Sequence, residues 1–396
     1  MNNFIVWDKN GQYDLFLSKQ VGAPWFEDIE IVTQKDCPAH VRNYAGKKIV
    51  LVEYYCGQFL EIWPLTLDLS WADLVVCFDS EYVASKQGYY KQAVKTFKNS
   101  NIVFITGGIG TDPNDVVANN RFFSPYLAFF HRSIMGNYDV KCNYTNTRPY
   151  LFDVLLGGKK YHRLFVYNKL KETKLIDSSI VALKTTPFDT YLEDGGDMST
   201  PSSLWRKRPD VEDFYSPVLD QLEDPDMLEF KRINKQLTAL NSSRIVPWRF
   251  YKDSPSNVQL SIIISPKVYE NSWYSIISET TYGPFLFLTE KTAKPMYCKR
   301  IFVSFSFVGH LQFLRSLGFK TFDGIIDESY DQETNHDKRF AMAWQQVEYL
   351  ASTDPIEVYQ KASEILDHNY QLMQQITYTN NIQVQNFIKQ HLNLLT

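Results

Sequence analysis

Continuous apolar runs are the first pattern along the N-terminal third of the chain. Three of them, Lys48–Tyr55 (KIVLVEYY), Asp73–Asp79 (DLVVCFD) and Asn101–Thr106 (NIVFIT), show little alternation of polar and apolar residues. Strands that are buried on both faces, as in a parallel sheet, have this pattern. Between the second and third runs, Glu81–Lys98 has helical character with a lysine-rich exposed face. We therefore predict a doubly wound α/β domain over residues 1–148.

A second group of apolar runs begins after Asn143–Pro149 (NYTNTRP), a polar segment that we interpret as a linker. Strands are expected at about 150–156, 180–183, 260–264, 273–278 and 301–306. Residues 149–360 are predicted to form a second α/β domain, with a proline-rich, loop-rich insertion near 199–229. From Asp337 to the end, the chain is Gln-rich and predicted to be helical.

Composition narrows the class of protein. Hydrophobic residues at 44% and charged residues at 22% are typical of a globular protein, and the net charge of −4 provides no field that attracts nucleic acid to the whole surface. The five cysteines are scattered without a Cys-x-x-Cys pair, which indicates free thiols in a reducing compartment. The N-terminus lacks a signal-peptide pattern, and apolar runs of about eight residues are too short to cross a bilayer. We expect a cytoplasmic protein without membrane contact.

The densest set of candidate ligand-binding residues follows the apolar run Pro284–Leu288. Thr289, Glu290 and Lys291 come next, and Glu279 precedes them. Thr289 is expected to cap a helix whose free N–H groups favour an anion. Lys291 adds a positive charge for phosphate, and Glu290 can accept hydrogen bonds from a ribose diol. The order strand, loop, helix start, strand is how an open α/β sheet presents such residues. A plain helix start with solvated charges is the alternative.

These residues resemble the donor motif of fucosyltransferase-like enzymes with the GT-B fold, in which a Glu precedes a T-E-K triplet. Two flanking segments are similar to glycosyltransferases of T-even-like phages. They are Phe152–Leu170 (FDVLLGGKKYHRLFVYNKL) and Gly309–Asp331 (GHLQFLRSLGFKTFDGIIDESYD). The resemblance covers about half the chain, from Phe152 to about Asp331, and does not extend to specific residues of the N-terminal third.

The resemblance implies an α/β, GT-B-like fold of two Rossmann-like domains that face an interdomain cleft. It implies that Glu279, Thr289, Glu290 and Lys291 bind a nucleoside-diphosphate sugar, here expected to be UDP-linked. It also implies that residues 361–396 pack back on the N-terminal domain. The phage enzymes transfer glucose or arabinose to hydroxylated cytosines in DNA, which makes double-stranded modified DNA the expected acceptor.

A basic turn provides a second candidate donor contact. His162 and Arg163 follow Gly157-Gly158-Lys159-Lys160, so backbone approach and cationic side chains occur together, as phosphate recognition requires. An exposed basic turn without a ligand is the alternative, and the resemblance favours the donor contact.

The catalytic base of an inverting transfer is expected in the N-terminal domain. Glu53 and Asp79 end apolar strands, where α/β sheets place ligands, and we take them as the candidates. A helix cap or a surface ion pair is the alternative for each, and a retaining enzyme would need no such base. Gly107–Asp112, after the third strand, is interpreted either as a mobile loop or as a sugar-binding turn.

No metal site is predicted. Asp224-Pro225-Asp226 has the form D-x-D, but it lies in an acidic loop without a preceding strand. No cluster of His, Cys or paired carboxylates has the spacing of metal ligands, so the nucleotide sugar is expected as co-substrate without an essential metal.

The acceptor is expected to contact a basic, aromatic patch in the insertion. Trp205, Arg206, Lys207 and Arg208 combine one ring with three cations, which suits a flipped base and its phosphates. A solvated basic stretch is the alternative. Two other functions stay open for the whole chain: transfer to lipopolysaccharide or another glycan, and binding of a nucleotide sugar without turnover.

Overall fold

The computed structural model describes residues 4–8, 30–33, 36–53, 67–79, 88–110, 121–124, 142–157, 160–183, 214–220, 264, 266–280, 282–283 and 285–392. The chain forms two compact units. Unit 1 comprises residues 1–136, 285–288 and 374–396, and unit 2 comprises residues 137–284 and 289–373. Each unit contains a largely parallel β-sheet flanked by helices, so the predicted α/β class with parallel sheets is confirmed.

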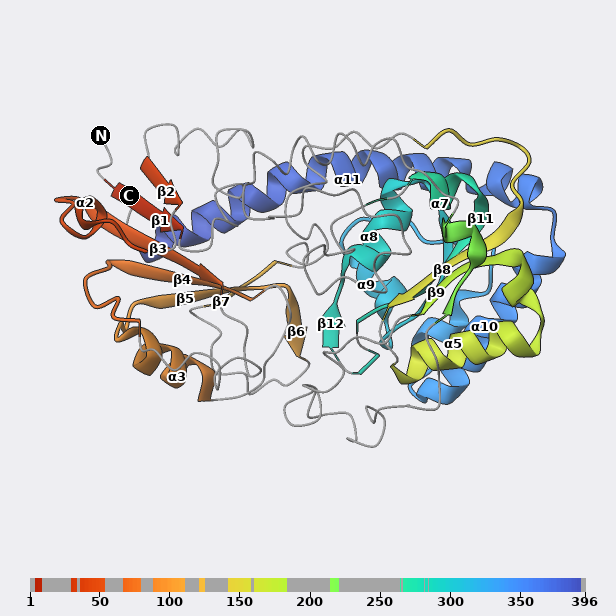
Figure 1. Ribbon diagram of the computed structural model, residues 1–396, viewed down its shortest axis with the longest axis horizontal. Helices are drawn as coiled ribbons and strands as arrows, with labels where there is room; N and C mark the ends of the chain where they lie inside the picture. The colour runs from red at the N-terminus through yellow and green to blue at the C-terminus, as the bar shows by residue number, and fades with distance from the viewer. Residues whose placement is uncertain are drawn as a thin grey trace. The chain divides into compact units, whose positions relative to one another are not determined.

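Unit 1 contains a six-stranded sheet in the order β2-β1-β3-β4-β5-β7, in which every neighbouring pair is parallel (Figure 1). Its strands are β1 (Phe4–Asp8), β2 (Glu30–Thr33), β3 (Lys47–Glu53), β4 (Leu74–Asp79), β5 (Ile102–Thr106) and β7 (Arg121–Phe123). Its short helices are α2 (Ala39–Arg42) and α3 (Gly88–Phe97). β3, β4 and β5 coincide with the three apolar runs, because a strand covered on both faces needs apolar side chains at successive positions.

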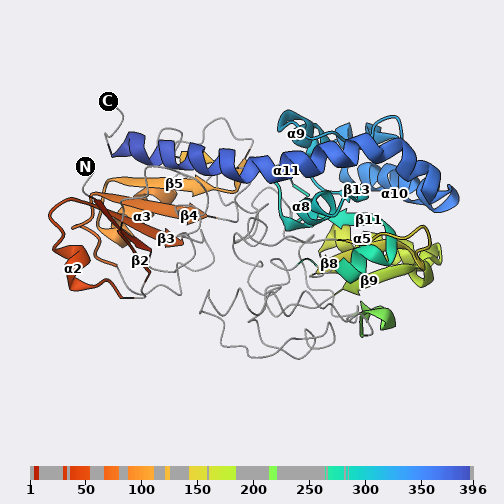
Figure 2. The same ribbon diagram turned by 90° about the horizontal axis from the view of Figure 1, so that it is seen from above.

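Side chains on the two faces of this sheet belong to two core layers. On one face, Val50, Val75 and Cys77 pack with Phe97 of α3. On the other face lie Ile49, Leu51, Val76, Phe78, Val103 and Ile105, together with Val384, Ile388 and Leu392 from the end of the chain. Val384 and Ile388 belong to α11 (Pro355–His391) and Leu392 follows it directly; the C-terminal part of this helix runs along the strands in both views (Figures 1 and 2). None of the described helices has the length and apolar character needed to cross a membrane.

The apolar run before the T-E-K triplet does not join a parallel sheet. Phe285–Phe287 forms β12, which pairs antiparallel with β6 (Gly108–Gly110) in a separate two-stranded sheet of unit 1. The glycine segment after β5 is therefore a strand rather than a loop over these residues. The chain passes from unit 1 to unit 2 between Leu288 and Thr289. The T-E-K triplet therefore begins a helix of unit 2, whereas the strand before it belongs to unit 1.

Unit 2 contains a five-stranded sheet in the order β10-β9-β8-β11-β13, parallel except for β10 at its edge. The strands are β8 (Tyr150–Gly157), β9 (Ser179–Leu183), β10 (Phe214–Tyr215), β11 (Ser272–Ser278) and β13 (Ile301–Phe305). The α-helices that accompany them are α5 (Tyr161–Glu172), α7 (Pro266–Glu270), α8 (Glu290–Tyr297), α9 (His310–Ser316) and α10 (His336–Ser352). Short 3-10 helices are found at Leu175–Ser178, Pro217–Asp220 and Glu328–Gln332. The strand expected at 260–264 lies almost entirely outside the described residues.

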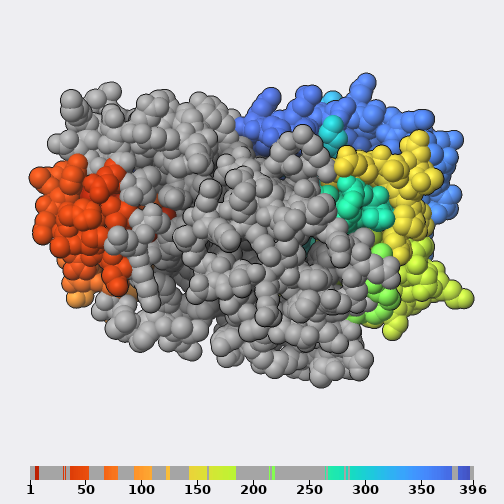
Figure 3. All heavy atoms as spheres, turned by 45° about the horizontal axis from the view of Figure 1, so that its top comes forward, coloured from red at the N-terminus to blue at the C-terminus, as the bar shows by residue number. Residues whose placement is uncertain are grey.

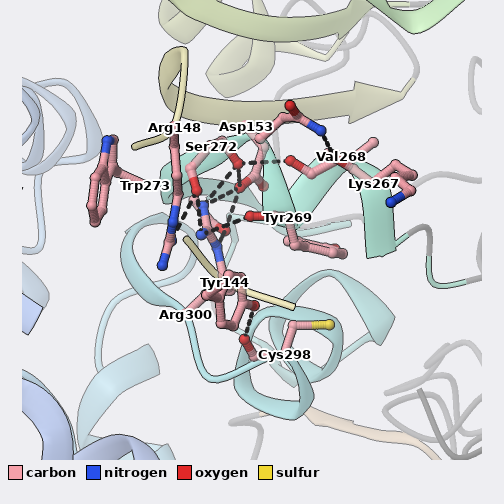
Figure 4. A network of polar contacts seen from close by, with 12 residues as sticks. Tyr144, Arg148, Asp153, Lys267, Val268, Tyr269, Ser272, Trp273, Cys298 and Arg300 are labelled. Carbon is pink, nitrogen blue, oxygen red and sulfur yellow. Dashed lines mark hydrogen bonds and ion pairs between the residues drawn. The ribbon is translucent and has the colours of Figure 1, made fainter. Parts of the chain in front are cut away.

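A buried ion pair organises the sheet of unit 2 near the start of β11 and β13 (Figure 4). The Arg300 guanidinium donates to Asp153 Oδ2 at 2.9 Å and to the Ser272 hydroxyl at 2.8 Å. Ser272 and Ser275 hydroxyls donate to the same carboxylate oxygen at 2.9 and 2.8 Å. Arg300 and Asp153 are both buried. Burial raises the pKa of Asp153, and Arg300 and the serine hydroxyls oppose that rise.

The segment expected as a linker packs against this network in unit 2. Tyr144 donates its hydroxyl to the Cys298 carbonyl, and Arg148 donates to the Ser272 carbonyl at 3.0 Å. The Arg148 guanidinium also lies 4.3 Å from the ring centres of both Tyr144 and Trp273. In Figure 3, yellow atoms of this part of the chain lie directly against teal atoms of the region around 265–300. These contacts fix residues 142–149 as part of unit 2.

Replacing Asp153 with Asn should destabilise unit 2 severely, because the Arg300 charge would remain buried without its carboxylate. Loss of one partner of a buried ion pair costs about 3–5 kcal/mol. Urea unfolding of Asp153→Asn should show a decrease of this size. Lys299→Ala, which removes an exposed ion pair with Asp367, is the control and should change stability by less than about 1 kcal/mol. Equal, small effects of both substitutions would contradict the role given to Arg300.

Candidate functional site

Residues that follow the carboxyl ends of parallel strands gather at one edge of a sheet. In unit 2, His162 and Arg163 lie at the start of α5, which follows β8, and Glu279 follows β11 directly. α8 begins at Glu290, with Thr289 as its N-cap. Hydrogen bonds join these three segments, so the structure brings all six predicted donor-site residues into one cluster, which we call the carboxyl-edge site.

The Glu279 carboxylate is the centre of this cluster and is fully buried. Its Oε1 accepts hydrogen bonds from the Thr289 N–H at 3.1 Å and from the Thr292 hydroxyl at 2.5 Å. Its Oε2 accepts from the Thr289 hydroxyl at 2.5 Å and from the Thr280 N–H at 3.2 Å. Four donors therefore surround one carboxylate, which has about four acceptor positions.

This arrangement explains how α8 starts. The Thr289 hydroxyl donates to Glu279 and accepts from the Lys291 N–H at 3.3 Å, so the predicted N-cap is confirmed. The negative charge of Glu279 already lies against the positive end of α8. An additional anion at this edge therefore depends more on cationic side chains than on the helix dipole. Direct contact between Glu279 and a donor stays a prediction, since here the carboxylate is used by the turn.

Cationic side chains surround the first turn of α8. Lys291 Nζ lies 2.7 Å from Glu290 Oε1 and 3.3 Å from the Thr280 hydroxyl. Lys160 Nζ donates to the Thr280 carbonyl at 2.8 Å, so two lysines contact the same residue from different elements. Burial lowers the pKa of Lys294, one turn along α8, to about 8, and the carboxylate of Glu290 opposes that shift. The Glu290 carboxylate therefore lies close to the cations of Lys291 and Lys294, which would also attract a bound anion.

The His162-Arg163 pair that follows the basic turn is buried rather than exposed. His162 and Arg163 are 0% and 4% exposed, and both contact the Glu279 carbonyl, at 2.7 Å from His162 Nε2 and 3.2 Å from the Arg163 guanidinium. Because a carbonyl only accepts, Nε2 of His162 carries the hydrogen. Burial lowers the pKa of His162 well below its usual value, and the charges of Arg163, Lys160 and Lys291 lower it further. Three cations therefore act on one neutral imidazole.

A second histidine, His310, is linked to Glu279 through the Thr292 hydroxyl. It was not among the site residues predicted from the sequence. His310 Nε2 lies 3.2 Å from the Thr292 hydroxyl, and its Nδ1 lies 2.9 Å from the Ser304 hydroxyl. Since Thr292 donates to Glu279, it accepts from His310, and Ser304 then donates to Nδ1. This chain fixes the tautomer of His310 and links β13 to the start of α8. In the sequence, the role of His310 is indicated only by its position a few residues after a predicted strand.

The carboxyl-edge site has an excess of positive charge. Among the described residues of the cluster, Lys160, Arg163, Lys291 and Lys294 are cationic, whereas Glu279 and Glu290 are carboxylates. This excess of two positive charges occurs in a chain with a net charge of −4. Within the described residues, the buried hydroxyls of Ser278 and Ser306 and Nδ1 of His162 also lack hydrogen-bond partners. The arrangement is suited to a polar anion that also carries hydroxyl groups.

The other predicted site residues are not part of this cluster. Glu53 and Asp79 are the last residues of β3 and β4 in unit 1, and their backbone positions at the carboxyl ends agree with the sequence prediction. Their side chains, and all of Trp205, Arg206, Lys207 and Arg208, lie outside the described part of the structure. Within that part, no three His, Cys, Asp or Glu side chains group as metal ligands do.

Stability between pH 6.5 and 4 should depend on His310. Burial lowers its pKa to about 4 from a usual 6.5, and Asp331 opposes the shift. The folded state therefore binds fewer protons than the unfolded state in this range. The associated stability is complete above about pH 6.5 and is lost towards pH 4, by as much as about 3 kcal/mol. In urea unfolding, His310→Gln should reduce this pH dependence, whereas His368→Gln at an exposed position of α11 should preserve it. Identical pH curves for both variants would contradict this assignment.

Comparison with known proteins assigns no family to this chain. No family model, no curated protein and no solved structure matches it. The inference of function therefore depends on the residues of the carboxyl-edge site and on the resemblance of their motif.

Proposed function

We propose that the protein is a glycosyltransferase that uses a nucleoside-diphosphate sugar, with the donor bound at the carboxyl-edge site of a GT-B-like fold. The observation that carries this proposal is the convergence of Lys160, Arg163 and Lys291 around the start of α8, beside the carboxylate of Glu290. The cations suit a diphosphate, and the carboxylate suits a ribose diol. Together they match the two hydrophilic parts of a nucleoside diphosphate.

The same groups favour the chemistry of transfer. When the bond between the sugar and the diphosphate breaks, negative charge develops on the leaving phosphate oxygen. Fixed cations at a site with little solvent stabilise that charge without reorganising. Lys291 is the most suitable group for this role, because its present partner Glu290 becomes available for the ribose when Lys291 turns to the phosphate. The neutral His162 keeps additional charge away from the sugar.

The acceptor half of the proposal comes from the sequence. In an inverting reaction, the acceptor hydroxyl attacks the anomeric carbon while a carboxylate, Glu53 or Asp79, takes its proton. We propose hydroxymethylcytosine in double-stranded DNA as the acceptor, with glucose or arabinose as the transferred sugar. Transfer to a glycan and binding without turnover are alternative outcomes that a product analysis distinguishes.

Donor binding should weaken when the charge of Lys291 is removed. Lys291→Ala is expected to raise the donor dissociation constant by the equivalent of about 1–3 kcal/mol, the scale of a hydrogen bond to a charged group. Glu290→Gln should have a smaller effect, because glutamine can still accept from a ribose hydroxyl. Isothermal calorimetry with UDP- and GDP-sugars provides the measurement.

Lys299→Ala is the matched control, since Lys299 follows the other end of α8 and pairs with Asp367 at the surface. It should leave donor affinity unchanged. If Lys291→Ala and Lys299→Ala bind donor as tightly as the parent does, the triplet is only a helix start and the proposed donor site is wrong.

DNA binding should depend on the basic patch of the insertion. Replacing Arg206, Lys207 and Arg208 with Ala should weaken binding to all DNA sequences and flatten its dependence on salt, since fewer counterions are released. Donor affinity should not change. Fluorescence titrations at several salt concentrations provide the test, and an unchanged salt slope in the triple variant would remove this patch from the acceptor site.

A further inference from the structure

Arg339 is a buried cation that forms no ion pair with any carboxylate of the described residues. It lies in the first turns of α10 and is 3% exposed. Its guanidinium donates to the carbonyls of Ser306 at 3.2 Å, Glu333 at 2.7 Å and Tyr282 at 3.3 Å. Among the described residues, no carboxylate lies within ion-pair distance of it. Buried charges in proteins are ordinarily paired, so this one requires an explanation.

The nearest carboxylates are occupied elsewhere. Asp331 accepts the Leu311 and Gln312 N–H groups at 2.8 and 3.0 Å, which holds it at the start of α9. Glu333 accepts the Asn335 N–H at 2.8 Å. Both act on Arg339 only over a longer range, raising its pKa, whereas burial is the larger effect and lowers it to about 10. Arg339 is thus charged at neutral pH and only partly compensated.

Two of its carbonyl partners lie on segments that follow strands of the unit 2 sheet. Tyr282 belongs to the loop after β11 that contains Glu279 and Thr280, and Ser306 follows β13. The ring of Tyr282 lies 5.0 Å from the ring of His162, which contacts Glu279. Arg339 is therefore linked to His162 of the carboxyl-edge site through Tyr282. Its hydrogen bonds also hold the segments after β11 and β13 in place.

We infer that Arg339 is a positioning residue for anion binding: it fixes the loops after β11 and β13, and the diphosphate of a bound ligand provides its missing counter-charge. This inference rests on the proposed donor site and adds a specific residue that does not touch the ligand. A charge in a poorly solvated region acts over several ångströms, so contact is not required.

Two variants that differ in charge separate this role from a packing role. Arg339→Lys keeps the positive charge but loses the planar set of donors, and Arg339→Gln keeps an amide donor but loses the charge. Binding of inorganic pyrophosphate, measured by calorimetry, is the readout. We expect Arg339→Gln to bind about tenfold more weakly than Arg339→Lys. Equal pyrophosphate affinity of the two variants would overturn the inference.

Removing a negative charge near Arg339 should have the opposite effect to removing the charge of Arg339 itself. Glu333→Gln keeps the bond to the Asn335 N–H and removes a negative charge that partly offsets Arg339. It should strengthen pyrophosphate binding about twofold to threefold, whereas Glu364→Gln, at an exposed position of α11, should have no effect. Unchanged or weaker binding in Glu333→Gln would count against the inference even if the Arg339 variants do not fold. If the parent protein binds neither pyrophosphate nor a nucleoside diphosphate, the donor site itself is wrong.

Discussion

The four hydrogen bonds to the Glu279 carboxylate are the interaction on which the carboxyl-edge site depends. They join the end of β11 to the cap of α8, and through Thr292 they reach His310 and β13. A buried carboxylate is tolerable only when its acceptor positions are filled. Because the donors come from two separate segments, Glu279 determines where Thr289 lies and therefore where Glu290 and Lys291 project.

Burial of bases at this edge has a common electrostatic consequence. Lys294 and Arg339 have lowered pKa values of about 8 and about 10, and His162 and His310 are neutral for the same reason, desolvation. Burial makes the protonated form of each of these bases less favourable than it is in water. A bound diphosphate would act in the opposite direction and favour the protonated forms. Strongly perturbed groups that cluster in this way are typical of binding sites.

The sequence predicted the local elements better than their partners. The strands β3, β4, β5, β8, β9, β11 and β13 and the cap at Thr289 were identified, because continuous apolar runs and capping residues leave a direct signal. The pairing of Phe285–Phe287 with Gly108–Gly110 was missed, since contacts between segments that are distant in sequence leave no periodic pattern. Thr280, His310 and Arg339 were missed for the same reason. Each contributes through bonds to remote backbone or hydroxyl groups.

The central claim is that the carboxyl-edge site binds a nucleoside-diphosphate sugar for transfer. Mass spectrometry of reaction products tests it most directly, using a panel of UDP- and GDP-sugars with hydroxymethylcytosine DNA or a glycan acceptor. The account predicts that one sugar of the panel adds the mass of a hexose or pentose to the modified DNA and releases the nucleoside diphosphate. No mass gain on any acceptor, and no release of nucleotide from any donor, would contradict it.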